Sequence, residues 1–182
     1  MGSLLTTIRF LSKLLKPSST ANGAPVSLSI SDYTVRADVY SPKDAPIGVV
    51  LCVHGMTPYG YRDERMKDMA RAFVACGYVA VLPDYPEIKQ GLIEVGSVER
   101  IVKTVQALIA NTSLCPKGQL AVCTASFSGC LCIRAVGDLR INQQITSLAI
   151  FGGCYDVGHC FRDILTTPGR DPFAKLILLK NI

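Results

Sequence analysis

The sequence is poor in the residue types that several classes of function require. Its 182 residues include no tryptophan and two histidines, His54 and His159. None of the eight cysteines forms a Cys-x-x-Cys pair, and no run of five or more basic residues occurs. The zinc and redox sites built on Cys-x-x-Cys motifs are therefore excluded. The net charge of +5 is scattered along the chain, so we expect no nucleic-acid partner.

The cysteines are predicted to be free thiols. Most lie in apolar runs such as "VVLCVH" and "LAVCTA", where a free cysteine packs as a small buried hydrophobe. Cys154, His159 and Cys160 form the one cluster of mixed ligand types, and their spacing matches no metal motif. We therefore expect no metal and no cofactor. So many unpaired thiols favour a reducing compartment, which predicts a cytoplasmic protein.

The first sixteen residues differ in character from the rest of the chain. Leucine or isoleucine recurs at helical spacing at positions 4, 8, 11 and 15, basic residues are interleaved, and the first acidic residue is Asp32. This segment is too short and too charged to span a bilayer, and no signal-peptidase site follows it. Three interpretations remain open: a helix packed on the domain, a helix in weak contact with a membrane surface, or a leader that targets an organelle.

The remaining pattern predicts one α/β domain. Residues 17–25 are small, polar and bounded by prolines, which is typical of a linker, and residues 26–182 form the predicted domain. A hairpin is expected first, with its turn at Ser31-Asp32. From Ile47 onward, four continuous apolar segments alternate with amphipathic helical segments. This alternation predicts a three-layer α/β/α sandwich with a mostly parallel sheet.

Two details of the helices are also predicted. Ser97 is placed to cap the helix that precedes the third apolar segment. The last residues of the chain are expected to form two helices, interrupted at Thr167-Pro168-Gly169.

The stretch "LAVCTASFSGCLCIRA", Leu120 to Ala135, predicts a strand, a turn of small residues and a helix. A serine at such a turn can act as a nucleophile, because its hydroxyl projects from the turn and the first N–H groups of the helix face the developing charge. Residues 124–128 match Gly-x-Ser-x-Gly with Thr and Ser in place of the glycines, which puts Ser126 at the tip. Ser128 falls in the first helical turn, where it is expected to ease packing or to hydrogen-bond the backbone. We therefore expect Ser126 to be the nucleophile of this elbow.

An acyl-transfer nucleophile also needs donors for an oxyanion. His54-Gly55 ends the first apolar segment, and Met56 begins the loop that follows it. The backbone N–H groups of Met56 and Phe127 are the predicted oxyanion donors.

The order of these features resembles the α/β-hydrolase superfamily, especially its dienelactone-hydrolase-like and carboxylesterase-like members. The resemblance covers residues 26–155. It implies a serine hydrolase that acts on a small-molecule carboxylic ester or a related acyl bond, with Ser126 as the nucleophile. It also implies that Met56 and Phe127 form the oxyanion hole and that His54 is a structural residue of the oxyanion loop.

The resemblance is incomplete in the residues that would activate Ser126. In the family an acid and then a histidine follow the nucleophile, on loops after later strands. The candidates in this chain are Asp156 as the acid and His159 as the base, and both come earlier than the family pattern places them. We therefore expect the N-terminal portion of the fold, truncated at the C-terminus, with an open sheet edge that allows self-association. The alternative function is a non-catalytic domain used for binding or assembly.

Overall fold

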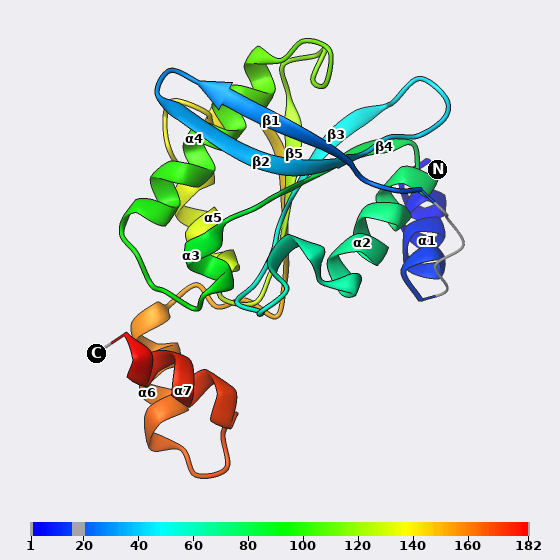
Figure 1. The fold of residues 1–182 in the computed structure, drawn as a ribbon. Coiled ribbons are helices and arrows are strands. Elements are labelled where there is room, and N and C mark those ends of the chain that lie inside the picture. Colours follow the sequence, from blue (N-terminus) through cyan, green and yellow to red (C-terminus); the bar gives the residue numbers. More distant parts are fainter. Residues whose placement is uncertain (1, 16–20, 182) are drawn as a thin grey trace.

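A six-stranded sheet with helices on both faces forms the centre of the computed structural model (Figure 1), which describes residues 2–15 and 21–181. The elements follow the chain in this order: α1 (Gly2–Leu15), β1 (Ala24–Ile30), β2 (Tyr33–Tyr40), β3 (Gly48–Val53), η1 (Gly60–Arg62), α2 (Glu64–Ala75), β4 (Tyr78–Pro83), α3 (Pro86–Lys89), α4 (Gly96–Ala110), β5 (Leu120–Ala125), α5 (Ser128–Val136), η2 (Asn142–Gln144), β6 (Ile145–Phe151), α6 (Val157–Thr166) and α7 (Pro172–Lys180).

The strand order in the sheet is β1-β2-β4-β3-β5-β6. Strands β1 and β2 form the predicted hairpin, and the last pair of its register, Ile30 and Tyr33, encloses the turn at Ser31-Asp32. Strand β2 is antiparallel to β4, whereas β3, β4, β5 and β6 are parallel to one another. The carboxyl ends of these four strands therefore meet at one edge of the sheet, where ligands bind in open α/β sheets.

The parallel strands are buried on both faces. In β3, Val49, Leu51 and Val53 belong to one hydrophobic cluster, and the alternating residues Val50 and Cys52 belong to the other. All five are at most 4% exposed, which explains why the sequence of this strand is apolar without interruption. Figure 1 shows α2 on one face of the sheet and α4 with α5 on the other. The predicted three-layer architecture is confirmed.

Helix α1 packs on the surface of α2. The rings of Phe10 and Phe73 lie with their centroids 4.6 Å apart. On another side of α1, Ile8, Leu11 and Leu15 are 54%, 47% and 81% exposed. Helix α1 is thus packed on the domain. Because its apolar stripe is exposed, contact between α1 and a membrane surface stays a prediction. None of the helices in the described ranges is both long and apolar enough to cross a bilayer.

Two predicted boundaries shift in the structure. Strand β1 begins at Ala24, so the last two residues of the predicted linker 17–25 belong to the sheet, and residues 16–20 lie outside the described part of the chain. The prediction that Ser97 caps a helix is wrong, because α4 begins at Gly96 and its N-cap is Val95. The buried Ser97 hydroxyl instead donates to the carboxylate of Glu87, at 3.4 Å.

The predicted break between the two last helices is confirmed, since α6 and α7 are separated at residues 167–171. Both helices lie beyond the edge where the parallel strands end (Figure 1). The end of α7 is tied to the loop after α3, because the Asn181 amide donates to the Gly91 carbonyl at 2.8 Å and Lys180 Nζ donates to the Gln90 carbonyl at 2.7 Å. These contacts fasten the end of α7 to the body of the domain.

Candidate active site

The turn between β5 and α5 holds Ser126 in a left-handed conformation, with φ of 58°. An L-residue pays roughly 1–2 kcal/mol for this conformation, and such strain is found most often at functional sites. The turn is fixed by two backbone hydrogen bonds: Ser126 N–H donates to the Phe151 carbonyl at 2.8 Å, and Gly129 N–H donates to the Ser126 carbonyl at 3.0 Å. The Ser126 side chain is exposed at the tip.

The sharp turn depends on close contact between three backbone segments. A Cβ atom on Gly55 would lie 3.1 Å from Ser126 Cβ, and one on Gly153 would lie 3.1 Å from the Ser126 carbonyl oxygen. A Cβ atom on Gly129 would lie 2.6 Å from Ile150 Cγ2. The distance at Gly129 is shorter than real Cβ contacts, and the two at 3.1 Å require the neighbouring atoms to shift. Gly55, Gly129 and Gly153 therefore allow the close packing of this turn.

Ser128 has a structural role. Its side chain is fully buried, and its hydroxyl donates to the His54 carbonyl at 2.6 Å. This bond joins the start of α5 to the end of β3. The prediction that Ser128 hydrogen-bonds the backbone is confirmed, and its hydroxyl has no access to a substrate.

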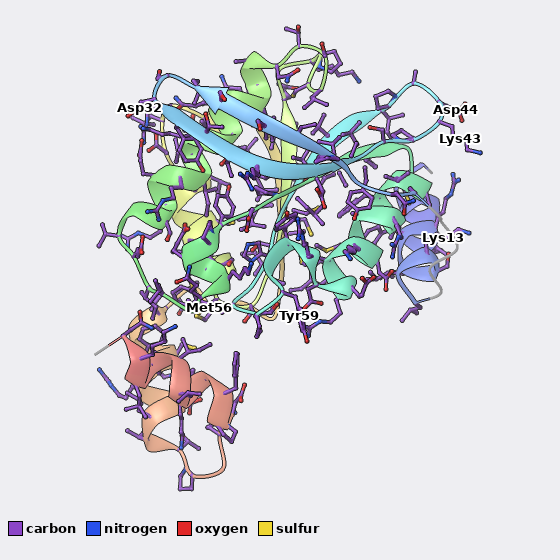
Figure 2. All side chains as sticks on the ribbon, in the orientation of Figure 1. Lys13, Asp32, Lys43, Asp44, Met56 and Tyr59 are labelled. Carbon is purple, nitrogen blue, oxygen red and sulfur yellow. The ribbon has the colours of Figure 1, made fainter. Side chains whose placement is uncertain are left out.

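The predicted oxyanion donors flank Ser126 on two loops. Among the described residues, neither Met56 N–H nor Phe127 N–H donates a hydrogen bond within the chain. Unpaired N–H groups are rare at buried backbone positions, and Met56 is only 8% exposed. Figure 2 places Met56 at the sheet edge that faces α6 and α7. Neither N–H group thus has an acceptor among the described residues, and their role as oxyanion donors stays a prediction.

Two cavities meet at Ser126 and Met56. The first has a volume of about 320 Å³ and a mostly apolar lining, in which the Phe127 and Phe161 rings stack with centroids 6.0 Å apart. The second, of about 380 Å³, contains the ion pair of Asp63 and Arg65 at 2.7 Å. The hydrogen bond from Arg65 lowers the pKa of Asp63 to about 2. Both cavities are thus mostly apolar, and the charged pair of Asp63 and Arg65 distinguishes the second from the first.

His54 is fully buried beneath this site, and both of its ring nitrogens are engaged. Nε2 accepts a hydrogen bond from Tyr85 N–H at 3.3 Å, which assigns the ring proton to Nδ1. Nδ1 then donates to the Gly55 carbonyl at 2.9 Å. Burial lowers the pKa of His54. The ring therefore holds the oxyanion loop in place as a neutral group and is not available as a base.

This burial predicts a specific loss of stability in acid. The unfolded chain protonates His54 near pH 6.5, whereas the folded chain resists protonation to a lower pH. The stability that neutral His54 contributes is complete above about pH 6.5 and is lost as the pH falls toward the lowered folded-state pKa, at up to about 1.4 kcal/mol per pH unit. In urea unfolding between pH 7 and pH 5, His54→Gln is expected to show a smaller decline than wild type. His159→Gln, which changes an exposed side chain, is the control, and equal declines in wild type and His54→Gln would contradict the assignment.

Asp156 and His159 lie at the start of α6. The Asp156 carboxylate caps this helix by accepting a hydrogen bond from the backbone N–H of His159 at 2.8 Å. The Asp156 carboxylate thus binds the main chain of His159 and not its imidazole. Both residues are exposed. Among the described residues, no hydrogen bond joins either side chain to Ser126. The structure does not assemble a triad from these three residues.

No set of three or more His, Cys, Asp or Glu side chains within residues 2–15 and 21–181 is arranged to hold a metal ion. Cys154 and Cys160 do lie at the apolar cavity. The described residues of the candidate site thus bring together the exposed Ser126, two N–H groups without an acceptor among those residues and two cavities.

No protein-family model and no curated protein matches the sequence. Solved structures do match. The dienelactone hydrolase of Anabaena variabilis superposes with a TM-score of 0.61 at 17% identity, over 74% of this chain and 65% of that one. A dienelactone hydrolase-like promiscuous phosphotriesterase from metagenomic libraries gives 0.57 at 14% identity, over 89% and 76%.

A thermophilic carboxylesterase cloned from a metagenomic library superposes with a TM-score of 0.56 at 16% identity, over 97% of this chain and 64% of that one. The chain thus spans less than two thirds of the length of this esterase and of the Anabaena enzyme. The chain has the α/β-hydrolase fold.

Proposed function

We propose that this protein is a serine hydrolase that cleaves carboxylic esters or related acyl bonds through Ser126. The observation that carries the proposal is the strained, exposed Ser126 at the end of β5, with the unpaired N–H groups of Met56 and Phe127 beside it. The matching solved structures of a dienelactone hydrolase and a carboxylesterase support the same reaction class.

In the proposed reaction, Ser126 Oγ attacks the carbonyl carbon of the ester and gives its proton to a base. The carbonyl oxygen becomes an oxyanion, which accepts hydrogen bonds from Met56 and Phe127 N–H. The tetrahedral intermediate collapses, the bond to the leaving alcohol breaks, and the alkoxide takes up a proton. Water then hydrolyses the acyl-serine to release the acid. The positive end of the α5 dipole stabilises the oxyanion in both steps.

The cavities indicate the kind of substrate. The 320 Å³ cavity carries apolar side chains from α6 and α7, such as Phe161 and Ile177, which suit an uncharged apolar group of the ester. In the 380 Å³ cavity, Asp63 and Arg65 neutralise each other, so neither charge is free to select an ionic substrate. A small neutral ester with one apolar arm fits this pair of cavities.

The base is the part of the mechanism that the described residues do not supply. The chain has two histidines: both ring nitrogens of His54 are hydrogen-bonded, and His159 makes no hydrogen bond to Ser126. A positioned base contributes about 10²–10⁴-fold in rate. We infer that a segment outside the described residues, or a partner chain, provides it. The chain by itself is then a slow esterase that a small external base can accelerate.

A panel of p-nitrophenyl esters with acyl chains of increasing length tests this proposal. Wild type is expected to release p-nitrophenol faster than Ser126→Ala and to carry one acyl group on Ser126 in peptide mass mapping. Added imidazole is expected to raise the rate of wild type, after subtraction of the rate of Ser126→Ala at the same imidazole concentration, because it replaces the absent base. Equal rates for the two proteins in every condition would contradict the proposal.

The second candidate function is a binding or assembly domain without catalysis. It is favoured by β6, which pairs only with β5 among the described strands and leaves its other edge open. Phe151, at the end of this strand, is 44% exposed. An open edge can pair with a second copy of the chain. Concentration-dependent association together with an absence of Ser126 acylation would favour this function over hydrolysis.

We further propose that the protein resides in the cytoplasm. All eight cysteines are free thiols in the structure, which suits a reducing compartment. The exposed stripe of Ile8, Leu11 and Leu15 on α1 supports a weak additional contact with a membrane surface.

A further inference from the structure

Three thiols from three different elements gather beside Ser126. Cys130 lies in α5, Cys154 in the loop after β6, and Cys160 in α6. The sulfur atoms of Cys130 and Cys154 are 3.0 Å apart, and Cys130 S–H donates to the Cys154 carbonyl at 2.7 Å. Cys160 lines the same cavity as Cys154. The proposed hydrolysis uses none of these groups.

The backbones that carry Cys130 and Cys154 are held together by their neighbours. A Cβ atom on Gly129 would lie 3.3 Å from the Cα of Gly153, so the start of α5 and the loop after β6 are in van der Waals contact at this point. A disulfide needs its two sulfur atoms about 2.05 Å apart, which is about 1 Å closer than the free thiols. Gly152 and Gly153 are the residues before Cys154, and they give the loop the freedom to make this shift.

We propose that Cys130 and Cys154 form a reversible disulfide under mild oxidation, and that this bond fixes the loop at residues 152–156 against α5. The inference rests on the proximity of the two sulfur atoms and on the contact of their backbones. It does not depend on Ser126 being a nucleophile. It adds a covalent modification site to the wall of the apolar cavity, which Cys154 lines.

The oxidant class is a hydroperoxide, with hydrogen peroxide as the simplest member. Cys154 is partly exposed, whereas Cys130 is 4% exposed, so peroxide reaches Cys154 first. The Cys154 thiolate attacks one peroxide oxygen and the O–O bond breaks, which gives a sulfenic acid and a hydroxide ion that takes up a proton from solvent to become water. Cys130 sulfur then attacks the Cys154 sulfur, the S–O bond breaks, and a second water leaves. The two thiols lose two electrons, which the peroxide gains, and a dithiol reductant reverses the reaction.

The rate of this oxidation is expected to rise with pH. Burial raises the pKa of the Cys154 thiol, the neighbouring Cys130 raises it further, and the hydrogen bond with Cys160 lowers it. Asp163 and Arg170 are the charged groups that act on Cys160. Because the raised pKa keeps the thiolate scarce at pH 7, and the thiolate is the reacting form, oxidation is expected to be about tenfold faster for each pH unit up to the pKa. Which two cysteines pair is therefore decided by the short distance between their sulfur atoms and not by an acidic thiol.

The test uses the full chain, reduced and then exposed to hydrogen peroxide under native conditions. Free thiols are alkylated, and disulfide-linked peptides are mapped by mass spectrometry without reduction. The expected result is one linked pair, Cys130 with Cys154, which disappears after treatment with dithiothreitol. The oxidised chain is expected to unfold at a higher urea concentration than the reduced chain, because a cross-link restricts the unfolded state.

Three variants separate this inference from other oxidation chemistry. Cys130→Ala and Cys154→Ala are each expected to lose the linked peptide and the shift in urea midpoint. Cys160→Ala, which removes a thiol at the same cavity, is the matched control and is expected to keep both. A Cys154–Cys160 bond, scrambled pairs, or no disulfide in wild type would overturn the proposal.

The result is also independent of the proposed hydrolysis. Ser126→Ala is expected to form the Cys130–Cys154 bond as wild type does. A wild-type chain that forms the bond but never acylates Ser126 would overturn the proposed function and support this inference. A chain that acylates Ser126 but forms no Cys130–Cys154 disulfide would support the proposed function and overturn this inference.

Discussion

Wild-type protein treated with a fluorophosphonate probe is expected to take up one phosphonyl group, on Ser126. Ser126→Ala is expected to reduce this labelling by about 100-fold or more, because removal of a nucleophile abolishes the covalent step. The expectation follows from the exposed hydroxyl at φ of 58° and the two unpaired N–H groups beside it. Gel fluorescence measured over time gives the rate of labelling, and peptide mass mapping then identifies the labelled residue.

The matched control is Ser31→Ala. Ser31 is the other non-glycine residue with a positive φ in the described part of the chain, at 51°, but it lies in the β1–β2 turn. The variant therefore tests whether a strained serine alone attracts the probe, and its labelling is expected to equal that of wild type. Labelling that persists in Ser126→Ala would remove Ser126 as the nucleophile.

Gly129→Ala is expected to destabilise the fold by about 1–3 kcal/mol, as overpacking of a filled core does. The new methyl group would lie 2.6 Å from Ile150 Cγ2 and 3.3 Å from Gly153 Cα. The Cγ2 atom is a branch methyl held close to the backbone of β6, so it cannot rotate away freely. Urea unfolding monitored by circular dichroism measures the free-energy change, and Ser126 labelling is expected to fall as the elbow distorts.

Gly137→Ala is the control for this substitution. Gly137 ends α5 with φ of −79°, and a Cβ atom there would meet its nearest neighbour at 3.6 Å, an ordinary contact. Its effect is expected to stay within about 0.5 kcal/mol. Equal stabilities for Gly129→Ala and Gly137→Ala would show that the turn tolerates bulk and would contradict the steric account of the elbow.

The parts of the fold that were predictable are those in which burial determines the pattern. Residues 49–53 are apolar without interruption because both faces of β3 are covered. A small residue at position 129 was predictable because the turn leaves little room for a side chain there. In both cases the packing around each residue restricts its type, so the local sequence predicts the local structure.

Features that depend on one polar contact were less predictable. Ser97 has the residue type of a helix cap, but its hydroxyl donates to Glu87, which lies ten positions earlier in the chain. Asp156 and His159 have the residue types of an acid and a base, yet a spacing of three is also that of an N-cap and the N–H that it accepts from. The four-residue helix α3 is too short to show a periodic pattern.

The thiol cluster could not be read from the sequence. Cys130 and Cys154 are 24 positions apart, and they meet only because β6 lies beside β5 and its following loop returns over α5. In the sequence each appears as one more cysteine among small or apolar neighbours. Only the packed arrangement shows that two of the eight cysteine sulfur atoms are in contact near Ser126.

The most direct test of the proposed hydrolase site is a crystal structure of the phosphonylated protein. The adduct is expected on Ser126 Oγ, with the phosphonyl oxygen about 2.7–3.1 Å from the backbone nitrogens of both Met56 and Phe127. That result would show that the elbow and the oxyanion loop act together on one bound oxygen. An adduct on another residue, or a phosphonyl oxygen that faces solvent away from both N–H groups, would contradict the assignment of this site.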